Sequence, residues 1–274
     1  MTDIGENSEA GPGLVEGQEQ DWTALIQAAS EDTPQTRTAV EWVEGLGTAS
    51  QPQKFICDDA ALYLVKFTNN PHGDGKGNVA EQIVARAGAL IGAPVPEAGL
   101  VEVSAELLGA PQLPDFAGAG VHHGSRWAHG YSDRQHLAYV DENRERFGAL
   151  DVLYAWMLCV GDHQWIYRNE APHEVLSVDH TSFFPGSPAW TAEGLRAEST
   201  NPAPDATLAT LNLTPTDRGP ALEKLRAVSD ADIARVVAAP PSEWGISVDE
   251  RVALAAYLAG RKDAVLELFG AKEV

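Results

Sequence analysis

The stretch from Trp156 to Pro185 constrains this chain more than any other, because it places reactive polar residues between strongly apolar runs. An apolar helical run ends at Gly161 and a polar loop follows. The segment 174–178 then has the composition of a short strand that delivers a carboxylate at its end. The polar residues gathered here are Asp162, His163, Asn169, Asp179 and His180. Two carboxylates this close to buried elements predict a site for catalysis or for a metal.

The charge of the chain narrows the classes of partner. Its 274 residues include 19 Lys and Arg against 40 Asp and Glu, which gives a formal net charge of -21. So acidic a chain is disfavoured as a direct partner of nucleic acids or of anionic membranes.

The two cysteines, Cys57 and Cys159, lie among apolar residues and are expected to be free thiols. The N-terminal residues lack the basic and apolar regions of a leader and no segment reaches transmembrane length, so a cytoplasmic protein is expected.

The order of predicted elements indicates an α+β protein whose first half mixes strands and helices and whose second half is mainly helical. Strands are predicted at residues 55–57, 62–67 and 95–103, and helices at 21–30, 36–45, 78–92, 147–160, 229–237 and 248–268. Residues 1–20 are rich in Gly, Glu and Gln and are predicted to form a disordered acidic tail. A linker near residues 104–113 is the expected boundary between one lobe at 21–107 and another at 108–274.

One charged residue stands inside a predicted strand. Lys66 lies within the apolar run 62–67, which makes it a candidate for an inward-facing ammonium that needs an anionic partner. Glu81 falls off the apolar stripe of the next predicted helix, and periodicity alone places it on the surface. The polar loop 47–54 offers backbone N–H groups that an anion can bind, although its composition alone is that of an ordinary turn.

A Gly- and His-rich stretch near residue 120 raises the possibility of a metal site. His122, His123 and His129 lie close together in the sequence. Adjacent His residues point in different directions on any regular element, so these are interpreted as ordinary loop residues.

Taken in order, several segments resemble the HipA-like kinase family, which belongs to the wider protein-kinase-like fold. The segments are ASQPQKF (49–55), YLVKF (63–67), AEQIVARAGALIGAPVP (80–96), GVHHGSRW (120–127), LDVLYAWMLCVGDHQW (150–165), SVDH (177–180) and PSEW (241–244). Their order and spacing carry the resemblance, which runs from about Thr36 to the C-terminus. It implies a bilobal fold with a small β-rich N-lobe and a larger, mainly helical C-lobe.

The resemblance also implies an ATP- and Mg²⁺-dependent phosphotransferase. In such kinases a strand Lys grips the nucleotide phosphates while a helix Glu holds that Lys, and these roles fall on Lys66 and Glu81. The loop before the strand would cover the phosphates, with backbone N–H groups near Ser50 and Gln51 as donors. The implied acceptor is a hydroxyl of a protein, a peptide or a small molecule, with Ser or Thr of a protein or peptide preferred.

The two carboxylates of the central stretch receive distinct roles from the resemblance. Asp162 matches the catalytic-loop aspartate that accepts the proton of the acceptor hydroxyl, and Asp179 matches the aspartate that holds Mg²⁺. His180 stands where better-known kinases have a Phe, and a role in orienting the loop is expected for it.

One position departs from the family pattern. An Asn is expected five residues after the catalytic aspartate as a second metal ligand, but Tyr167 stands there, and a neutral phenol is a poor ligand for Mg²⁺. Asn169 replaces that ligand if the loop is longer; His163, Gln164 or Asn169 acting through water is the alternative. The departure keeps a second function open, a pseudokinase that binds a nucleotide or a partner without transferring phosphate. A metal-dependent hydrolase ranks last because it leaves Lys66 unexplained.

Overall fold

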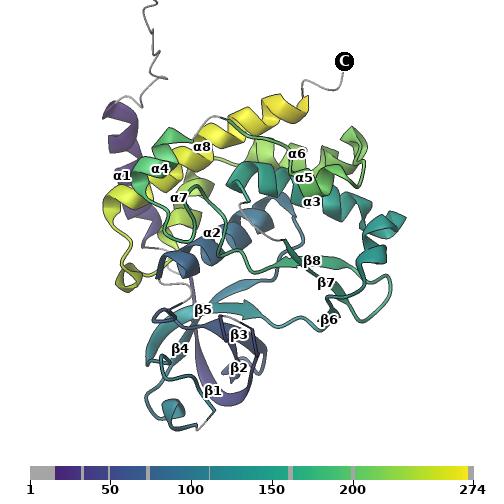
Figure 1. Cartoon of the computed structure of the whole chain (residues 1–274). Helices are drawn as coiled ribbons and strands as arrows, with labels where there is room; N and C mark the ends of the chain where they lie inside the picture. The colour runs from purple at the N-terminus through teal and green to yellow at the C-terminus, as the bar shows by residue number, and fades with distance from the viewer. Residues whose placement is uncertain are drawn as a thin grey trace, which may run out of the picture.

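The computed structural model describes residues 16–31, 34–48, 50–71, 75–110, 112–159, 163–198 and 201–270. A β-barrel occupies one end of the molecule and a layer of helices the other, with a small sheet beside them (Figure 1). This arrangement confirms the predicted α+β class, with a β-rich N-terminal part and a helical C-terminal part.

The barrel is built from five strands in the order β1-β2-β3-β5-β4. They are β1 (Thr36–Gly45), β2 (Gln53–Cys57), β3 (Leu62–Lys66), β4 (Ala98–Val103) and β5 (Gly120–Arg126). The barrel closes because β1 pairs antiparallel with β2 and parallel with β4. Inward side chains such as Phe55, Tyr63 and Val65 fill it, and each of its strands pairs with two neighbours. Strands β2, β3 and β4 confirm the predicted strands.

The prediction of a helix at residues 36–45 is wrong, because this segment forms β1. Ala39, Val40 and Val43 have a spacing compatible with a helix, yet Val40 and Val43 are 53% and 39% exposed while Ala39 is buried. On a strand, neighbouring side chains point to opposite faces, which accounts for this difference between Ala39 and Val40. Pairing with strands on both sides decides the conformation, and a single segment does not encode that pairing.

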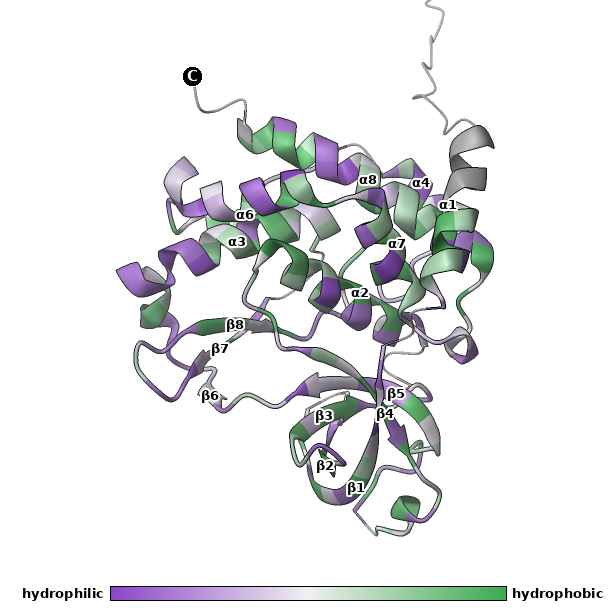
Figure 2. Cartoon of the chain, turned by 180° about the vertical axis from the view of Figure 1, so that it is seen from behind, coloured by the Kyte–Doolittle hydropathy of each residue, from purple (hydrophilic) through white to green (hydrophobic). Residues whose placement is uncertain are grey.

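The helices pack together and share one hydrophobic core. They are α1 (Glu16–Ala29), α2 (Gly75–Ile91), α3 (Asp141–Met157), α4 (Ala192–Ala197), α5 (Ala206–Ala209), α6 (Pro215–Ala227), α7 (Asp230–Ala238) and α8 (Val248–Gly270), with 3-10 turns η1 (Leu107–Gly109), η2 (Gln135–Tyr139) and η3 (Ser242–Trp244). The helices carry both hydrophobic and hydrophilic residues (Figure 2), and their apolar residues form a common core. Within the described ranges, none of them is long and apolar enough to cross a membrane.

The barrel and the helical layer are each assembled from segments that are separate in the sequence. α1 precedes the barrel but packs on α7 and α8, with Trp22 and Ile26 buried. It begins at Glu16, inside the segment predicted to be disordered; residues 1–15 of that segment lie outside the described residues. β5 belongs to the barrel although it follows the boundary predicted at residue 107. That boundary therefore does not divide the barrel from the helices.

A small antiparallel sheet lies beside the helical layer and carries the end of the central stretch. It consists of β6 (Gly130–Tyr131), β7 (Gln164–Arg168) and β8 (Val175–Val178), in that order. Gln164 pairs with Val178 and Tyr167 with Val175, so the first residue of β7 lies next to the end of β8.

Candidate functional site

A cavity of about 300 Å³ lies where the barrel meets the helical layer and the small sheet. Its walls come from the loop between β1 and β2, from β3 and α2, from the chain after β5, and from β7 and β8. Apolar side chains line much of it, among them Leu46, Leu64, Ile166 and Val178. Several of its polar side chains contact one another, and a largely apolar pocket with a few convergent polar groups is the usual form of a small-molecule site.

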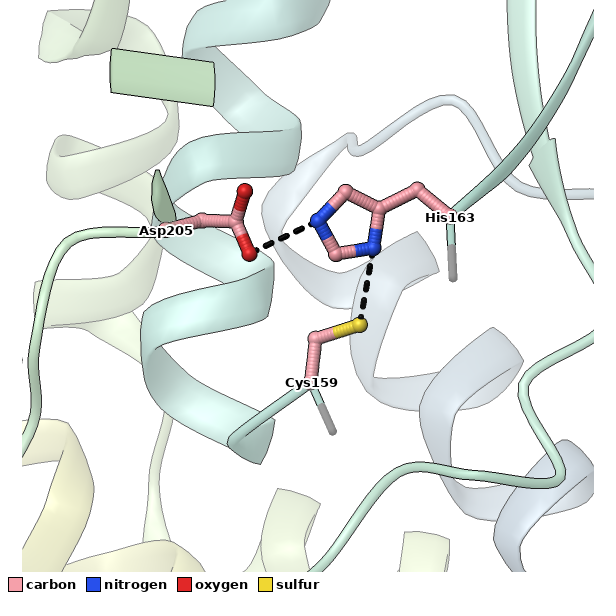
Figure 3. A group of neighbouring side chains, drawn as sticks. All are labelled: Cys159, His163 and Asp205. Carbon is pink, nitrogen blue, oxygen red and sulfur yellow. Dashed lines mark hydrogen bonds and ion pairs between the residues drawn. The ribbon is translucent and has the colours of Figure 1, made fainter. Parts of the chain in front are cut away.

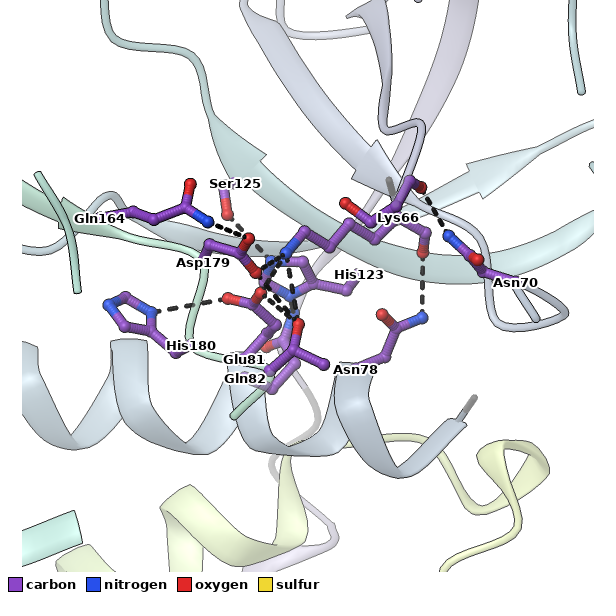
Figure 4. A network of polar contacts seen from close by, with 12 residues as sticks. Lys66, Asn70, Asn78, Glu81, Gln82, His123, Ser125, Gln164, Asp179 and His180 are labelled. Carbon is purple, nitrogen blue, oxygen red and sulfur yellow. Dashed lines mark hydrogen bonds and ion pairs between the residues drawn. The ribbon is translucent and has the colours of Figure 1, made fainter. Parts of the chain in front are cut away.

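Lys66, at the end of β3, is the centre of the polar contacts. Its Nζ donates to a carboxylate oxygen of Glu81 and, at 2.6 Å, to Oδ1 of Asp179 (Figure 4). Burial alone would lower the pKa of Lys66, but the two carboxylates outweigh burial and raise the pKa above its ordinary value. The inward ammonium with an anionic partner, predicted from the strand pattern, is present.

Glu81 is 2% exposed, so its placement on the surface by periodicity is wrong. Most residues of α2 are buried, and the apolar stripe therefore does not mark its only buried face. Burial alone would raise the pKa of Glu81, but the charge of Lys66 and a hydrogen bond from His180 hold the pKa well below 4.5. The ion pair with Lys66 that the family resemblance implied is formed in the structure.

Asp179 directly follows β8 and has a φ of 63°, a region that residues other than glycine rarely occupy. Its Oδ1 accepts from Lys66, and its Oδ2 accepts from Nε2 of Gln164 at 2.9 Å. The hydroxyl of Thr181 lies 3.2 Å from Oδ1. The carboxylate is thus held from both sides, while 31% of the side chain stays exposed. A fixed and accessible carboxylate of this kind is suited to binding a cation.

The loop between β1 and β2 reaches the cavity at Ser50. The carbonyl oxygen of Ser50 accepts from Nδ2 of Asn70 at 2.5 Å, which anchors the loop to the chain after β3. Gln51 has a φ of 40°, and its N–H donates to the carbonyl of Thr48 at 3.0 Å. Ser50 therefore lines the cavity, whereas the N–H of Gln51 is engaged within the loop.

Asp162 lies outside the described residues, which resume at His163. The end of α3, which precedes Asp162 in the sequence, is held in place by specific contacts. Leu158 has a φ of 60° and ends the helix, and Nε of the buried Arg261 donates to the carbonyl of Trp156 at 2.9 Å. A buried guanidinium from α8 thus replaces the intrahelical partners that the last carbonyls lack.

Asn169, the predicted second metal ligand, is not brought to the site. It follows the last residue of β7, and its N–H contacts the carbonyl of His129 at 3.4 Å. Gln164, opposite Val178, stands at the other end of β7, beside Asp179. Five residues of strand span roughly 16 Å, too far for Asn169 to share a cation with Asp179.

Tyr167 belongs to the core and does not face the cavity. It is 1% exposed, and its hydroxyl has no hydrogen-bond partner among the described residues. Burial raises the pKa of this phenol to about 12. Gln164 and Ile166, which alternate with it along β7, line the cavity instead. Strand alternation in this segment was the sequence signal that places Gln164 on the cavity side. From the sequence, Gln164 was only one of three residues considered to act on the metal through water.

His122 and His123 lie in β5, not in a loop as predicted, and both are buried. Nδ1 of His123 is 3.0 Å from Nε2 of Gln82, and its Nε2 is 2.9 Å from Oγ of Ser125. Burial lowers the pKa of His123 to about 4, so the ring is neutral at pH 7. It supports the α2 segment that carries Glu81.

No protein-family model and no curated protein matches the sequence. Among solved structures, the proinflammatory kinase CtkA of Helicobacter pylori aligns over 85% of this chain and 97% of its own, with a TM-score of 0.58 at 13% identity. The chain has a protein-kinase-like fold. Two structures of the Golgi casein kinase each align over 93% of this chain at 10% identity. The first has a TM-score of 0.43 and is covered over 77% of its own chain. The second, with Mn/ADP bound, has a TM-score of 0.41 and is covered over 78%. The resemblance to the HipA-like family rests on the sequence segments alone.

Proposed function

We propose that this protein is an ATP- and Mg²⁺-dependent kinase that transfers the γ-phosphoryl group to a hydroxyl, with Ser or Thr of a protein or peptide as the acceptor. The observation that supports it is the position of Lys66, whose ammonium contacts one carboxylate from α2 and one from the end of β8 at the wall of the cavity. Phosphoryl transfer depends mainly on positioning and electrostatic stabilisation, and an ammonium beside a metal-holding carboxylate supplies both.

The donor atoms at the cavity fit a hard divalent cation. Asp179 offers a carboxylate and Gln164 an amide oxygen, and Mg²⁺ prefers oxygen ligands of this kind. Each oxygen of Asp179 has two lone pairs, of which Lys66 and Gln164 occupy some and leave others for a cation. When bound, Mg²⁺ would neutralise negative charge on the nucleotide phosphates.

The chain's own residues then take the following roles in the proposal. Lys66 contacts the nucleotide phosphates and Glu81 keeps its ammonium oriented. The loop at Ser50 covers the phosphates, and apolar residues such as Leu46 contact the base. Asp162 accepts the proton of the acceptor hydroxyl.

Calorimetry and phosphoryl transfer test this proposal together. We expect ADP to bind in the presence of Mg²⁺ and to bind much more weakly in EDTA. We expect labelled phosphate to pass from ATP to a mixed Ser/Thr peptide library, and this transfer to disappear in Asp162→Asn and Asp179→Asn. A protein that binds no nucleotide with Mg²⁺ and turns over no ATP with any acceptor contradicts the proposal.

Replacing Gln164 with Leu is expected to weaken Mg²⁺-dependent ADP binding by about tenfold, because a hydrogen bond to a charged group contributes about 1.5 kcal/mol or more. The change removes the amide that fixes Oδ2 of Asp179 and leaves a shorter, apolar side chain. Calorimetry with Mg²⁺ and with EDTA measures it, and binding in EDTA should change less than twofold. Gln27→Leu, on the exposed face of α1, is the matched control. If Asn169→Ala weakens Mg²⁺-dependent ADP binding and Gln164→Leu does not, Asn169 is the metal ligand, as first predicted.

One observation favours a pseudokinase as a second candidate. The position where the family carries a metal-binding Asn is a core tyrosine, Tyr167. Mg²⁺-dependent nucleotide binding without transfer to any acceptor would support this alternative. Transfer that is lost in Asp162→Asn would exclude it.

A further inference from the structure

A second cluster of reactive side chains lies outside the nucleotide cavity. Sγ of Cys159 is 3.1 Å from Nδ1 of His163, and Nε2 of His163 is 2.7 Å from Oδ2 of Asp205 (Figure 3). The three residues come from the chain after α3, from the position just before β7 and from the N-cap of α5. Their ligand atoms lie within 4.8 Å of one another, and the side chains of His163 and Asp205 are only 6% and 10% exposed.

We propose that Cys159, His163 and Asp205 bind a thiophilic divalent cation, for which Zn²⁺ is the best match. Zn²⁺ takes sulfur, imidazole nitrogen and carboxylate oxygen as ligands, at about 2.0–2.3 Å in tetrahedral geometry. Ligand atoms around such an ion are roughly 3.3–3.8 Å apart, so the cluster has to contract by about 1 Å at its widest separation. Side-chain rotations of these three residues are sufficient for a contraction of this size.

The orientation of the imidazole ring is the main change that the site requires. With one ring nitrogen directed at Cys159 and the other at Asp205, the carbon between them, Cε1, faces the space enclosed by Sγ and Oδ2 (Figure 3). A half-turn of the His163 ring about the Cβ–Cγ bond exchanges Cε1 with Nε2. Nε2 then faces the space enclosed by Sγ and Oδ2. The two orientations have nearly the same shape and differ in which ring atoms are nitrogen.

Two of the ligands are held in place by groups that would not touch the ion. Oδ1 of Asp205 accepts from the N–H groups of Thr207 at 2.9 Å and Leu208 at 3.0 Å, which leaves Oδ2 directed at the cluster. Cys159 is fixed through its backbone by an isolated β-bridge to Phe183. Supporting contacts of this kind orient ligands and raise the affinity for a metal.

His163 is likewise confined, and it connects the cluster to solvent. Its ring centroid lies 4.8 Å from that of Tyr154 and 5.8 Å from that of Trp165. It also lines a cavity of about 400 Å³ between η2, β7 and α5. Water from this cavity can fill the fourth position of a tetrahedral ion, which three-ligand zinc sites leave open.

In the absence of an ion, the same residues form a hydrogen-bonded chain. Burial and the charge of Asp205 raise the pKa of the Cys159 thiol to about 12, so the thiol keeps its proton at pH 7, and the ring of His163 bridges this thiol and the carboxylate of Asp205. An ion has to displace the thiol proton, and its affinity should therefore increase with pH.

Titration with Co²⁺ in the absence of nucleotide tests the proposal, because a cobalt–thiolate bond gives a charge-transfer band in the near ultraviolet. We expect a band at one Co²⁺ per chain that Zn²⁺ abolishes. The band should persist in Cys57→Ala, which changes the only other cysteine, and in Asp179→Asn, and it should vanish in Cys159→Ala. Asp205→Asn keeps a good N-cap residue and should weaken Zn²⁺ binding by about tenfold or more.

The wild-type protein alone decides the main point, whatever the variants do to folding. Absence of a thiolate band in the wild type would reduce the cluster to a hydrogen-bonded chain only. A band that survives in Cys159→Ala would place the metal elsewhere. Because Co²⁺ is added without nucleotide and Asp179→Asn is included, the result does not depend on the proposed kinase activity.

Discussion

Replacing Lys66 with Met is expected to lower the free energy of unfolding by about 3 kcal/mol, because it leaves a buried charge without its partner. Glu81 is 2% exposed and would lose the cation that holds it ionised. The same variant is expected to lose Mg²⁺-dependent ADP binding and to lower phosphoryl transfer by about 10³-fold, the effect of removing a group that stabilises developing charge. Urea unfolding, calorimetry and labelled phosphate transfer measure the three effects.

The double variant Lys66→Met/Glu81→Gln separates the structural role of this lysine from its functional role. A neutral amide at position 81 removes the stranded charge, so the double variant should recover about 2 kcal/mol of stability relative to Lys66→Met. Nucleotide binding should not return with it. Recovery of binding together with stability would mean that Lys66 acts only on the fold. Lys54→Met is the matched control, because its partner Glu44 is 56% exposed and is left in solvent instead of buried, so its loss should cost much less than the loss of Lys66.

Glu81 should make the stability of the wild type and of Lys66→Met depend on pH in opposite directions. In the wild type the pKa of Glu81 is held well below 4.5, so its contribution to stability is present above pH 4.5 and is lost as the pH falls through the lowered value. Without Lys66, burial becomes the main influence and raises the pKa of Glu81 above 4.5. In Lys66→Met, the buried charge of Glu81 is therefore neutralised as the pH falls, and its destabilising effect becomes smaller. The stability difference between the two proteins should narrow from pH 7 toward about pH 4.5 in urea unfolding. A constant difference would show that Glu81 is not the group left unpaired.

Replacing Gly148 with Ala is expected to destabilise the protein by about 3 kcal/mol, the upper range for forcing extra volume into a packed core. A Cβ at this position in α3 would lie 2.0 Å from the carbonyl oxygen of Asp217 and 2.4 Å from its carbonyl carbon, at the start of α6. Backbone atoms cannot rotate away as a side chain does, so the two helices have to separate. This cost exceeds the gain of about 1 kcal/mol that Ala normally brings to a helix.

Gly194→Ala provides the comparison for Gly148→Ala. A Cβ at this position in α4 would meet its nearest atoms at 3.4 and 3.8 Å, ordinary contact distances. We expect no loss of stability, and a gain of up to about 1 kcal/mol. Urea unfolding of the two variants measures the difference. Equal effects would show that the close approach of α3 and α6 is not what requires glycine at position 148.

The local sequence was sufficient for much of the fold. Strands β2 and β3 were predictable because their apolar residues and turn signals lie within the segments themselves, and the same holds for α2, α3, α7 and α8. The inward position of Lys66 was also predictable, because strand alternation assigned a face to each of its neighbours. The motifs in their order indicated the protein-kinase-like fold before any tertiary contact was known.

The central stretch contributes residues to both of the sites proposed in this protein, but the sequence did not show which residue belongs to which site. Strand alternation in β7 places Gln164 beside Asp179, Tyr167 in the core and Asn169 at the far end of the hairpin. That outcome depends on register with β8, which spacing along the chain does not specify.

The local sequence specified the conformation of most elements and the types of residue available for chemistry. Which of those residues meet depends on contacts between distant parts of the chain. Lys66 contacts Asp179 from 113 positions away. His163 contacts Asp205 from 42 positions away. The β1 segment became a strand and Glu81 was buried for the same reason. Pairing and enclosure come from distant parts of the chain, and the free energy of those contacts outweighs local preference.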